Sequence, residues 1–258
     1  MSIEVCARLV EEGDPDRFDA TMAAPAEARL RLWPLYAVNL EIARAPWAAR
    51  EPMLAEMRLQ WWIDTIRDLG AGRERRGHPV IEALAPMLAA DSNLAELLCG
   101  LAEARRWDCL SEPFEDRAHF DAYLDATAGN LMWGAACALG APQGAEAVVR
   151  DLAWGAGLAQ WLRAAPELEA RGRLPLVDGR PEAIGALAAE GRARIARGRR
   201  VRTIVPAPAR PALWSAAGAD AVLRRAAARA TLVAAGGLAP SEFARRGRLL
   251  WVALTGRF

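Results

Sequence analysis

The 258-residue chain contains no lysine, so all 33 of its basic residues are arginine. The chain also has 32 acidic residues, so its formal net charge is +1. A chain so close to neutral has no global field that would attract nucleic acid, and we expect no nucleic-acid partner. Arginine without lysine, in a chain rich in alanine and glycine, is typical of a GC-rich bacterial genome rather than of one function.

Histidine and cysteine are also scarce. The chain has two histidines, His78 and His119, and four cysteines that lie far apart and form no CxxC pair. Zinc and iron–sulfur sites need clustered soft ligands, so the sequence argues against both classes of site. Isolated cysteines in a chain of this size are typical of reduced thiols in the core of a cytoplasmic protein.

Long apolar runs are missing as well. The first 18 residues carry acids and no apolar stretch, so we expect no signal peptide. The longest nearly uncharged stretch, residues 126–150, is interrupted by glycine and proline and falls short of a membrane span. We therefore expect a soluble, cytoplasmic protein with at most a peripheral contact to the inner membrane.

Period-two alternation of β-branched residues is almost absent, whereas alanine and leucine, the best helix formers, dominate. In segment 54–69, apolar residues recur every three to five positions, which predicts an amphipathic helix facing a core. These residues are Leu54, Met57, Trp61, Ile66 and Leu69. The sequence therefore predicts an all-α protein.

Proline and glycine divide the chain into eight or nine predicted helices. The breaks fall at residues 13–15, 45–47, 70–79, 111–113, 140–142, 171–181, 205–211 and 236–237. Asp91 or Ser92 is expected to cap a helix running through Cys99, and Pro240 with Ser241 precedes the last helix. No connector is long or simple enough to be an interdomain linker, so we predict a single domain over residues 1–258.

Five segments stand in an order and spacing that together are specific. The first reads Asp-Pro-Asp-Arg-Phe at 14–18 and leads to Leu-Tyr-Ala-Val-Asn-Leu-Glu-Ile-Ala at 35–43. The others are Met-Arg-Leu-Gln-Trp-Trp at 57–62, Arg-Arg-Trp-Asp at 105–108, Tyr-Leu-Asp-Ala-Thr-Ala-Gly-Asn at 123–130 and Gly-Leu-Ala-Gln-Trp-Leu-Arg at 157–163. Over about residues 14–180, this series resembles the squalene/phytoene synthase family. The resemblance implies an isoprenoid-synthase-type helical bundle.

In catalytic members of that family, two facing aspartate-rich motifs hold Mg²⁺ on the substrate diphosphate. Carboxylates at positions i and i+4 share one face of a helix, as such a site requires. The positions of this chain that align with the aspartates hold no acid: they are Ala43, Arg44, Ala164 and Leu168. Only Glu41 and Glu167 remain nearby, so we predict no catalytic residue, no metal site and no cofactor, and we expect Arg44 to meet any bound diphosphate.

Two other acidic pairs have DxxxD spacing, Asp64 with Asp68 and Asp121 with Asp125. In a chain this rich in acids, roughly four such pairs arise by chance. We interpret the first pair as a solvated helix face and the second as acids near a helix start, where the helix dipole favours them. A relocated metal site at the first pair stays open as an alternative.

One subgroup of the family resembles the chain more closely, the mitochondrial complex I assembly factor and its α-proteobacterial relatives. The similar segments are Asn-Leu-Glu at 39–41, the segment 57–62, and Leu-Arg-Ala-Ala-Pro at 162–166. This resemblance implies a non-catalytic protein that binds an isoprenoid or lipid ligand, or a respiratory complex subunit, during complex I assembly. The alternative is a Mg²⁺-dependent head-to-head prenyltransferase of isoprenoid biosynthesis.

Polar and aromatic residues on the segments expected to face the bundle interior are the candidate ligand-binding residues. They are Tyr36, Asn39, Glu41, Arg58, Gln60, Trp61, Asn130, Gln160 and Arg163. Buried polar groups need hydrogen-bond partners, so these side chains either satisfy one another or bind a polar headgroup. Six tryptophans on the same segments are expected inside, either as core or as the lining of an apolar tunnel. They are Trp61, Trp62, Trp107, Trp133, Trp154 and Trp161.

One dense basic block occupies residues 192–202. A solvated helix face is the preferred interpretation. The alternative is contact with an anionic membrane surface or an acidic partner, together with the apolar segment 249–252 near the end of the chain.

Overall fold

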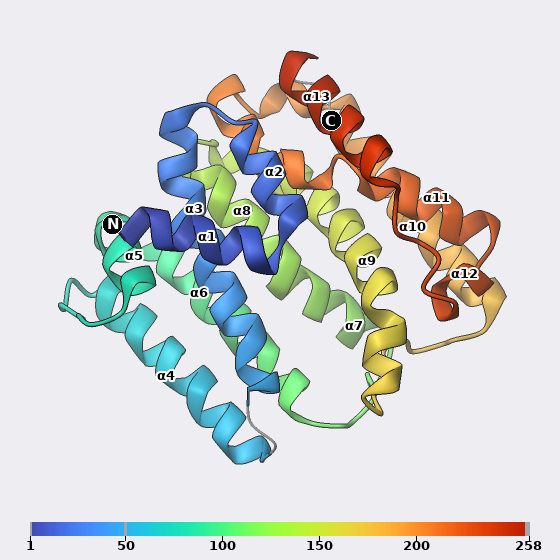
Figure 1. The fold of residues 1–258 in the computed structure, drawn as a ribbon, viewed down its shortest axis with the longest axis horizontal. Coiled ribbons are helices and arrows are strands. Elements are labelled where there is room, and N and C mark those ends of the chain that lie inside the picture. Colours follow the sequence, from blue (N-terminus) through green and yellow to red (C-terminus); the bar gives the residue numbers. More distant parts are fainter. Residues whose placement is uncertain (1, 49–50, 256–258) are drawn as a thin grey trace.

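Helices make up nearly all regular structure in the computed structural model, which describes residues 2–48 and 51–255 (Figure 1). This part of the chain contains thirteen α-helices, several short 3₁₀ segments and no β-strand. The all-α prediction is therefore confirmed, although the helices outnumber the eight or nine expected. None of the described helices combines the length and the apolar character needed to cross a lipid bilayer.

The helices follow one another with short connectors. They are α1 (Ser2–Gly13), α2 (Pro15–Met22), α3 (Ala26–Arg44), α4 (Pro52–Gly70), α5 (Pro79–Ala90), α6 (Ser92–Ala104), α7 (Arg117–Leu124), α8 (Asn130–Ala138), α9 (Glu146–Ala170), α10 (Pro181–Arg200), α11 (Ala219–Ala228), α12 (Thr231–Ala234) and α13 (Glu242–Thr255). A π-helical segment, Asp125–Gly129, joins α7 to α8, and a 3₁₀ segment, Ala207–Ala216, lies between α10 and α11.

Most helix ends lie at the predicted breaks. The carboxylate of Asp91 accepts hydrogen bonds from the backbone N–H groups of Asn93 (3.0 Å) and Leu94 (3.3 Å), and so begins α6 as expected. Ser241 Oγ accepts one from the N–H of Ala244 at 3.3 Å at the start of α13. The additional helices come from breaks near residues 23–25, 91, 125–129 and 229–230, of which the sequence analysis marked only the helix start at 91.

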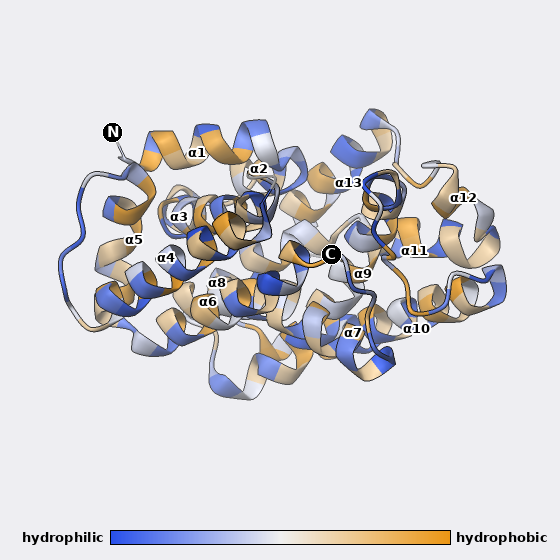
Figure 2. Cartoon of the chain, turned by 90° about the horizontal axis from the view of Figure 1, so that it is seen from below, coloured by the Kyte–Doolittle hydropathy of each residue, from blue (hydrophilic) through white to orange (hydrophobic). Residues whose placement is uncertain are grey.

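Helices α3, α8 and α9 form the centre of the molecule. Residues 152–159 of α9 are all buried, so this stretch of the helix has no solvent face. Helices α4, α5 and α6 lie to one side of the centre, and α10, α11 and α12 lie to the other (Figures 1 and 2). The central helices are therefore enclosed from both sides, which leaves their side chains to shape the interior.

The close approach of α9 and α10 depends on glycine. A Cβ atom at Gly155 would lie 2.5 Å from Ile195 Cγ1 and 2.9 Å from the backbone oxygen of Gly191. A Cβ at Gly191 would in turn lie 2.9 Å from a methyl group of Leu158. The two helices therefore touch almost at the backbone, and this dense contact fixes α9 against α10.

The core-facing side of α4 agrees with the prediction only in part, since Ile66 and Leu69 are buried as expected. Its buried residues are Ala55, Leu59, Trp62, Ile63, Thr65, Ile66 and Leu69. Leu54, Met57 and Trp61 are instead 47%, 61% and 46% exposed, so their predicted inward orientation was wrong. Large apolar residues occur on both faces of this helix, and apolar spacing alone did not distinguish the inner face from the outer one.

Candidate functional site

A cavity of about 350 Å³ lies beside α9 in the bundle interior. Helices α3 and α9, the π-helical segment and the turn at 105–108 supply most of its wall. Its polar lining residues are Arg17, Asn39, Arg105, Asp108, Tyr123, Thr127, Gln160, Glu167 and Arg171. The rest of the wall is largely apolar, and this volume falls in the range of small-molecule sites. We call this space the central cavity.

The π-helical segment Asp125–Gly129 forms one side of the central cavity. Thr127 Oγ1 donates a hydrogen bond of 2.7 Å to the carbonyl oxygen of Tyr123. A Cβ atom at Gly157 of α9 would lie 2.6 Å from Ala128 Cβ, so α9 approaches this segment closely. Such π-helical insertions are rare and frequently occur at functional sites.

Asp108 is the centre of a buried polar network in the cavity wall, and it is only 4% exposed. Arg105 Nη1 donates hydrogen bonds to Asp108 Oδ2 (2.9 Å) and to the Tyr123 hydroxyl (2.8 Å). That hydroxyl donates to Asp108 Oδ1 at 2.9 Å. Burial raises the pKa of Tyr123 well above its ordinary value, so the hydroxyl stays protonated and remains a donor. Asp108 is thus neutralised and held in place within the wall.

Hydrogen-bond donors outnumber acceptors around Asp108. Arg173 donates to the backbone oxygens of Asp108 (3.1 Å) and Trp107 (2.9 Å), and its guanidinium lies 4.8 Å from the centre of the Trp107 ring. The buried Nε atoms of Arg105 and Arg173 and the indole N–H of Trp107 find no acceptor among the described residues. Of these three residues only Arg105 lines the central cavity, so its Nε–H is the donor closest to a group bound there.

Aromatic rings pack behind this network. Trp107 stacks on Phe114 with ring centres 3.9 Å apart, and Tyr123 contacts Trp161 edge-on at 5.2 Å. The indole N–H of Trp161 donates to the carbonyl oxygen of Pro175 at 2.7 Å. These contacts fix the polar side chains against a rigid apolar layer.

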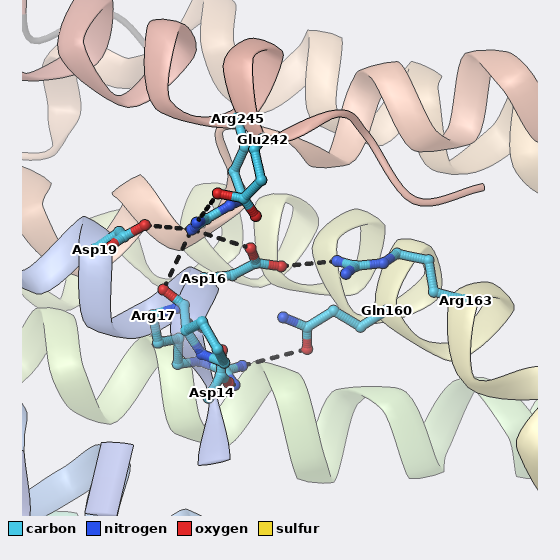
Figure 3. A network of polar contacts seen from close by, with 9 residues as sticks. Asp14, Asp16, Arg17, Asp19, Gln160, Arg163, Glu242 and Arg245 are labelled. Atoms are coloured by element: carbon cyan, nitrogen blue, oxygen red, sulfur yellow. Dashed lines mark hydrogen bonds and ion pairs between the residues drawn. The ribbon is translucent and has the colours of Figure 1, made fainter. Parts of the chain in front are cut away.

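Arg17 of α2 lies at another edge of the central cavity. Its side chain pairs with Asp14, which also accepts from the backbone N–H of Arg17 at 3.0 Å and so caps α2. Its guanidinium donates to Gln160 Oε1 at 3.5 Å (Figure 3). It also lies 5.7 Å from the ring centre of Tyr36. Burial raises the pKa of Tyr36 to about 12.

A second cavity, of about 370 Å³, lies between α9, α11 and α13, and Gln160 lines both cavities. Asp16 accepts a hydrogen bond from Arg163 at 2.7 Å and lies 3.7 Å from Arg245 at this second cavity (Figure 3). Arg245 also pairs with Asp19. Ion pairs therefore tie α2, α9 and α13 together, with Arg17 and Gln160 on the side of the central cavity.

Three of the nine candidate residues lie at or next to the central cavity. Asn39 and Gln160 line it, and Tyr36 lies close to Arg17. Asn39 is only 7% exposed, yet its amide makes no hydrogen bond with any residue that the structure describes. Its oxygen and N–H groups therefore remain available to a ligand in the cavity.

Three other candidates are used in polar contacts elsewhere. Arg163 pairs with Asp16 at the second cavity. The amide of Asn130 donates to the carbonyl oxygen of Leu97 at 3.1 Å and accepts from Arg150 at 3.2 Å, while Gln60 donates to Asp64 at 2.7 Å. These side chains are satisfied by the protein itself, which was one of the two alternatives for the set.

The remaining three do not line the central cavity. Arg58 and Trp61 lie on the exposed outer face of α4, so the inner-face prediction was wrong for both. Glu41 lies two residues beyond Asn39 on α3, roughly 200° around the helix from it, and does not line the central cavity. The reason is the same for all three, since neighbouring positions on a helix point in different directions.

Several residues of the site were not among the candidates. Arg17, Arg105, Asp108 and Tyr123 all lie in segments quoted for the family resemblance, so the segments were recognised but not the roles of these residues. Their joint burial depends on contacts between helices, and no local pattern indicates it.

The Mg²⁺ implied by the family can be tested against the donors of the central cavity. Ala43, Ala164 and Leu168, the positions aligned with catalytic aspartates, line the cavity, and none offers an oxygen ligand. Its two lining carboxylates are both engaged by arginine, Asp108 by Arg105 and Glu167 by Arg171. Mg²⁺ requires free carboxylate oxygens in near-octahedral geometry, so these residues do not fit it. No group of three or more histidine, cysteine or acidic side chains that could hold a metal occurs in residues 2–48 and 51–255.

Arg44 does not take the place of a metal ligand. Arg44 is exposed, and its side chain packs against α1. Its Nη2 atom lies 2.5 Å from the position that a Cβ atom on Gly13 would take. The expectation that a bound diphosphate would meet Arg44 was therefore wrong, because this side chain turns toward α1 and not into the central cavity.

The two acidic pairs with DxxxD spacing are occupied by nearby polar side chains. Asp68 accepts hydrogen bonds from Arg73 and Arg75, which lower its pKa, and Asp64 accepts one from Gln60. In the second pair, Asp121 binds Arg117 at 2.8 Å and Asp125 binds Arg150 at 3.0 Å. Neither pair presents two free carboxylates to one ion.

The fold is similar to those of two solved enzymes. A dehydrosqualene synthase, crystallised in complex with a ligand, superposes with a TM-score of 0.79 at 15% sequence identity, covering 99% of this chain and 96% of the enzyme. The squalene synthase HpnC from Alicyclobacillus acidocaldarius superposes with a TM-score of 0.71 at 19% identity, covering 91% of this chain and 94% of that one. At these identities the similarity concerns the fold alone.

Sequence comparison finds a local similarity to a protein of Drosophila melanogaster, the homolog of NADH dehydrogenase (ubiquinone) complex I assembly factor 6. The two are 37% identical over 62 residues, which is 24% of this chain and 19% of the Drosophila protein. The match thus spans about a fifth of that relative's length. The model of the squalene/phytoene synthase family matches residues 10–177. Because this match covers more than half of the chain, and the fold agrees with it, the chain belongs to the squalene/phytoene synthase family.

Proposed function

We propose that this protein is a non-catalytic member of its family that binds an isoprenoid or related lipid with an anionic head in the central cavity. The observation that carries the proposal is the network around Asp108. Its carboxylate is neutralised by Arg105, a cavity-lining residue whose buried Nε–H lacks an acceptor within the described part of the chain. Phosphate and carboxylate groups are acceptors that arginine recognises well.

The rest of the wall supports an amphipathic ligand. Leu124, Leu131 and Leu168 line the cavity and suit an apolar chain, whereas Arg17 and Asn39 suit its polar end. The chemistry of active relatives requires divalent cations to neutralise the leaving diphosphate. The carboxylates of this cavity are already paired with arginine, and this supports binding without cleavage of the ligand.

The binding proposal can be tested with farnesyl or geranylgeranyl diphosphate in the presence of Mg²⁺. We expect binding in isothermal titration calorimetry and no pyrophosphate release above background. Ala164→Trp should abolish binding, because Ala164 lines the cavity and the larger side chain would fill it. Ala170→Trp, on the exposed last turn of the same helix, is the matched control and should bind normally.

Two results would contradict the proposal. Pyrophosphate release would establish the alternative function, a Mg²⁺-dependent head-to-head prenyltransferase, which membership of the squalene/phytoene synthase family favours. The central cavity would not be the ligand site if no binding were observed, or if Ala164→Trp and Ala170→Trp bound the ligand equally well.

A role in assembling respiratory complex I, with a complex subunit as partner, is the second part of the proposal. It is supported by the 62-residue similarity to the Drosophila assembly factor homolog. Deletion of the gene should lower the amount of assembled complex I on native gels, and the wild-type gene should restore it. Failure of Ala164→Trp to restore it, with Ala170→Trp restoring it fully, would connect assembly to the cavity. Unchanged complex I after deletion would rule this role out.

A further inference from the structure

The C-terminal helix α13 (Glu242–Thr255) has its most apolar side toward solvent. Phe243, Leu250, Trp251 and Leu254 are 90%, 62%, 59% and 76% exposed. At 100° per residue, these four side chains fall within about 100° of the helix surface. A helix on the surface of a soluble protein normally turns its apolar side inward, so this arrangement is reversed. We call these four residues the outer stripe.

The opposite side of α13 holds the helix against the protein through polar contacts. Arg245 pairs with Asp19 of α2, and Arg248 donates to the carbonyl oxygen of Ala217 at 3.1 Å. Val252 on the same side is 1% exposed. Rotating α13 to bury the outer stripe would break these contacts, so the outward orientation belongs to the fold (Figure 3 shows the contacts of Arg245).

The charge of the chain is unevenly divided. Residues 192–258 carry fourteen arginines and two carboxylates, a formal charge of +12, whereas residues 1–191 carry nineteen arginines and thirty carboxylates, a charge of −11. Helices α10, α11, α12 and α13 lie together on one side of the molecule, away from α4 and α5 (Figures 1 and 2). The net charge of +1 therefore conceals an excess of arginine in these helices, α13 included, although Arg192 and Arg194 pair with Asp220 and Glu190.

Some arginines on this side are exposed and can bind an anion outside the protein. Arg224 and Arg229 are exposed and have no acidic partner in the part of the chain that the structure describes. Arg246, on α13 itself, is exposed and shares Glu242 with Arg245. In contrast, Arg197 of α10 pairs with Asp151.

We propose that the outer stripe of α13 and the surrounding arginines form a docking surface for an anionic lipid bilayer. Phe243 and the two leucines would enter the boundary between headgroups and acyl chains, where Trp251 is also favoured. The arginines would then lie at the level of the lipid phosphates. A second copy of the chain would instead bring its own arginines against these, and this like-charge contact disfavours self-association.

Vesicle flotation of the full chain tests this surface. We expect binding to phosphatidylcholine vesicles that contain phosphatidylglycerol, little binding to phosphatidylcholine alone, and loss of binding as salt is raised. Leu250→Ser with Leu254→Ser should weaken binding at least about tenfold, since two large apolar side chains no longer enter the lipid. Arg246→Gln should weaken it about fivefold, the usual effect of one arginine near an anionic membrane.

The exposed apolar residues of α4 provide a matched control on the acidic part of the chain. Met53→Ser with Met57→Ser removes comparable apolar surface, 72% and 61% exposed in the two residues, and should leave vesicle binding unchanged. Circular dichroism and thermal unfolding would confirm that each variant folds. As a second readout, brominated lipid should quench tryptophan fluorescence in the wild type and quench it less in Trp251→Phe.

Several outcomes would overturn the proposal. They are absence of binding to either vesicle, binding that does not depend on phosphatidylglycerol, and equal loss of binding in the α4 and α13 double variants. Sedimentation velocity adds one more: a wild-type dimer that the α13 substitutions convert to a monomer, without vesicle binding, would assign the outer stripe to self-association.

Discussion

Alkaline pH should destabilise this protein through its thiols and phenols. Because the chain has no lysine, its four cysteines and two tyrosines are the side chains that titrate between about pH 8.5 and pH 12. Burial raises the pKa of the thiols of Cys6, Cys109 and Cys137 to about 11, and that of the Tyr36 phenol to about 12. Burial also raises the pKa values of Cys99 and Tyr123.

The direction of the effect follows from proton binding. Above its ordinary pKa, each group is deprotonated in the unfolded chain but still protonated in the folded protein, so the free energy of unfolding falls as pH rises. The stability from each group is complete below the unfolded pKa and is lost as pH rises through the folded one. A full proton difference amounts to about 1.4 kcal/mol per pH unit.

The loss in the free energy of unfolding can be calculated for two enclosed groups, Cys6 and Tyr36. Cys6 is 0% exposed, and after some screening by solvent its shift corresponds to about 2 kcal/mol between pH 9 and pH 11. Tyr36, 3% exposed, adds at most about 1.4 kcal/mol between pH 10 and pH 11. Together they amount to about 3 kcal/mol, a large share of the roughly 5–15 kcal/mol that stabilises an ordinary domain.

Urea unfolding followed by circular dichroism, with a reducing agent present, would measure this loss between about pH 8 and pH 11. Tyrosinate absorbance should stay low in the folded protein near pH 10 and appear when urea unfolds the chain. Tyr36→Phe should remove its own share of the loss that begins above pH 10, and leave the shares due to Tyr123 and to the thiols. A free energy of unfolding that stays constant over this range, or tyrosinate absorbance in the folded protein near pH 10, would refute the reasoning.

Two substitutions test the packing around the site by urea unfolding. Asp108→Ala should lower the free energy of unfolding by about 3–5 kcal/mol, because it leaves Arg105 partly buried without its carboxylate. Glu74→Ala removes an exposed ion pair and should change the free energy of unfolding little. If Asp108→Ala and Glu74→Ala lowered it by similar amounts, Asp108 would not be part of an enclosed network. Gly155→Ala should cost about 1–3 kcal/mol, because the new Cβ would overlap α10, whereas Gly144→Ala meets no atom within 4 Å and should be tolerated. Wild-type stability of Gly155→Ala would disprove the close contact of α9 with α10.

Much of the fold was predictable because the relevant interactions are local. Alanine and leucine favour helix throughout, and the side chains of Asp91 and Ser241 cap helices that begin one residue later. The order of the family segments added the arrangement of the bundle. Of the site, the positions of Asn39 and Gln160 were foreseen, since both lie in those segments.

The remainder of the site was not predictable, because it depends on which helix faces contact each other. Trp61 and Trp62 are adjacent and alike, yet only Trp62 packs inward. Tyr123 reaches Arg105 and Asp108 only when α7 lies against the turn at 105–108.

By itself, the sequence determined the helical content, most helix ends and the absence of acids at Ala43, Ala164 and Leu168. Sequence spacing also places Arg105 near Asp108 and Arg171 near Glu167, three and four residues apart. Tertiary packing alone decided that Asp108 is buried and bonded to Tyr123. It also turned Arg44 away from the cavity and the apolar side of α13 toward solvent. The physical reason is that helix formation depends on neighbours in the chain, whereas the direction of each helix face depends on contacts between segments far apart in it.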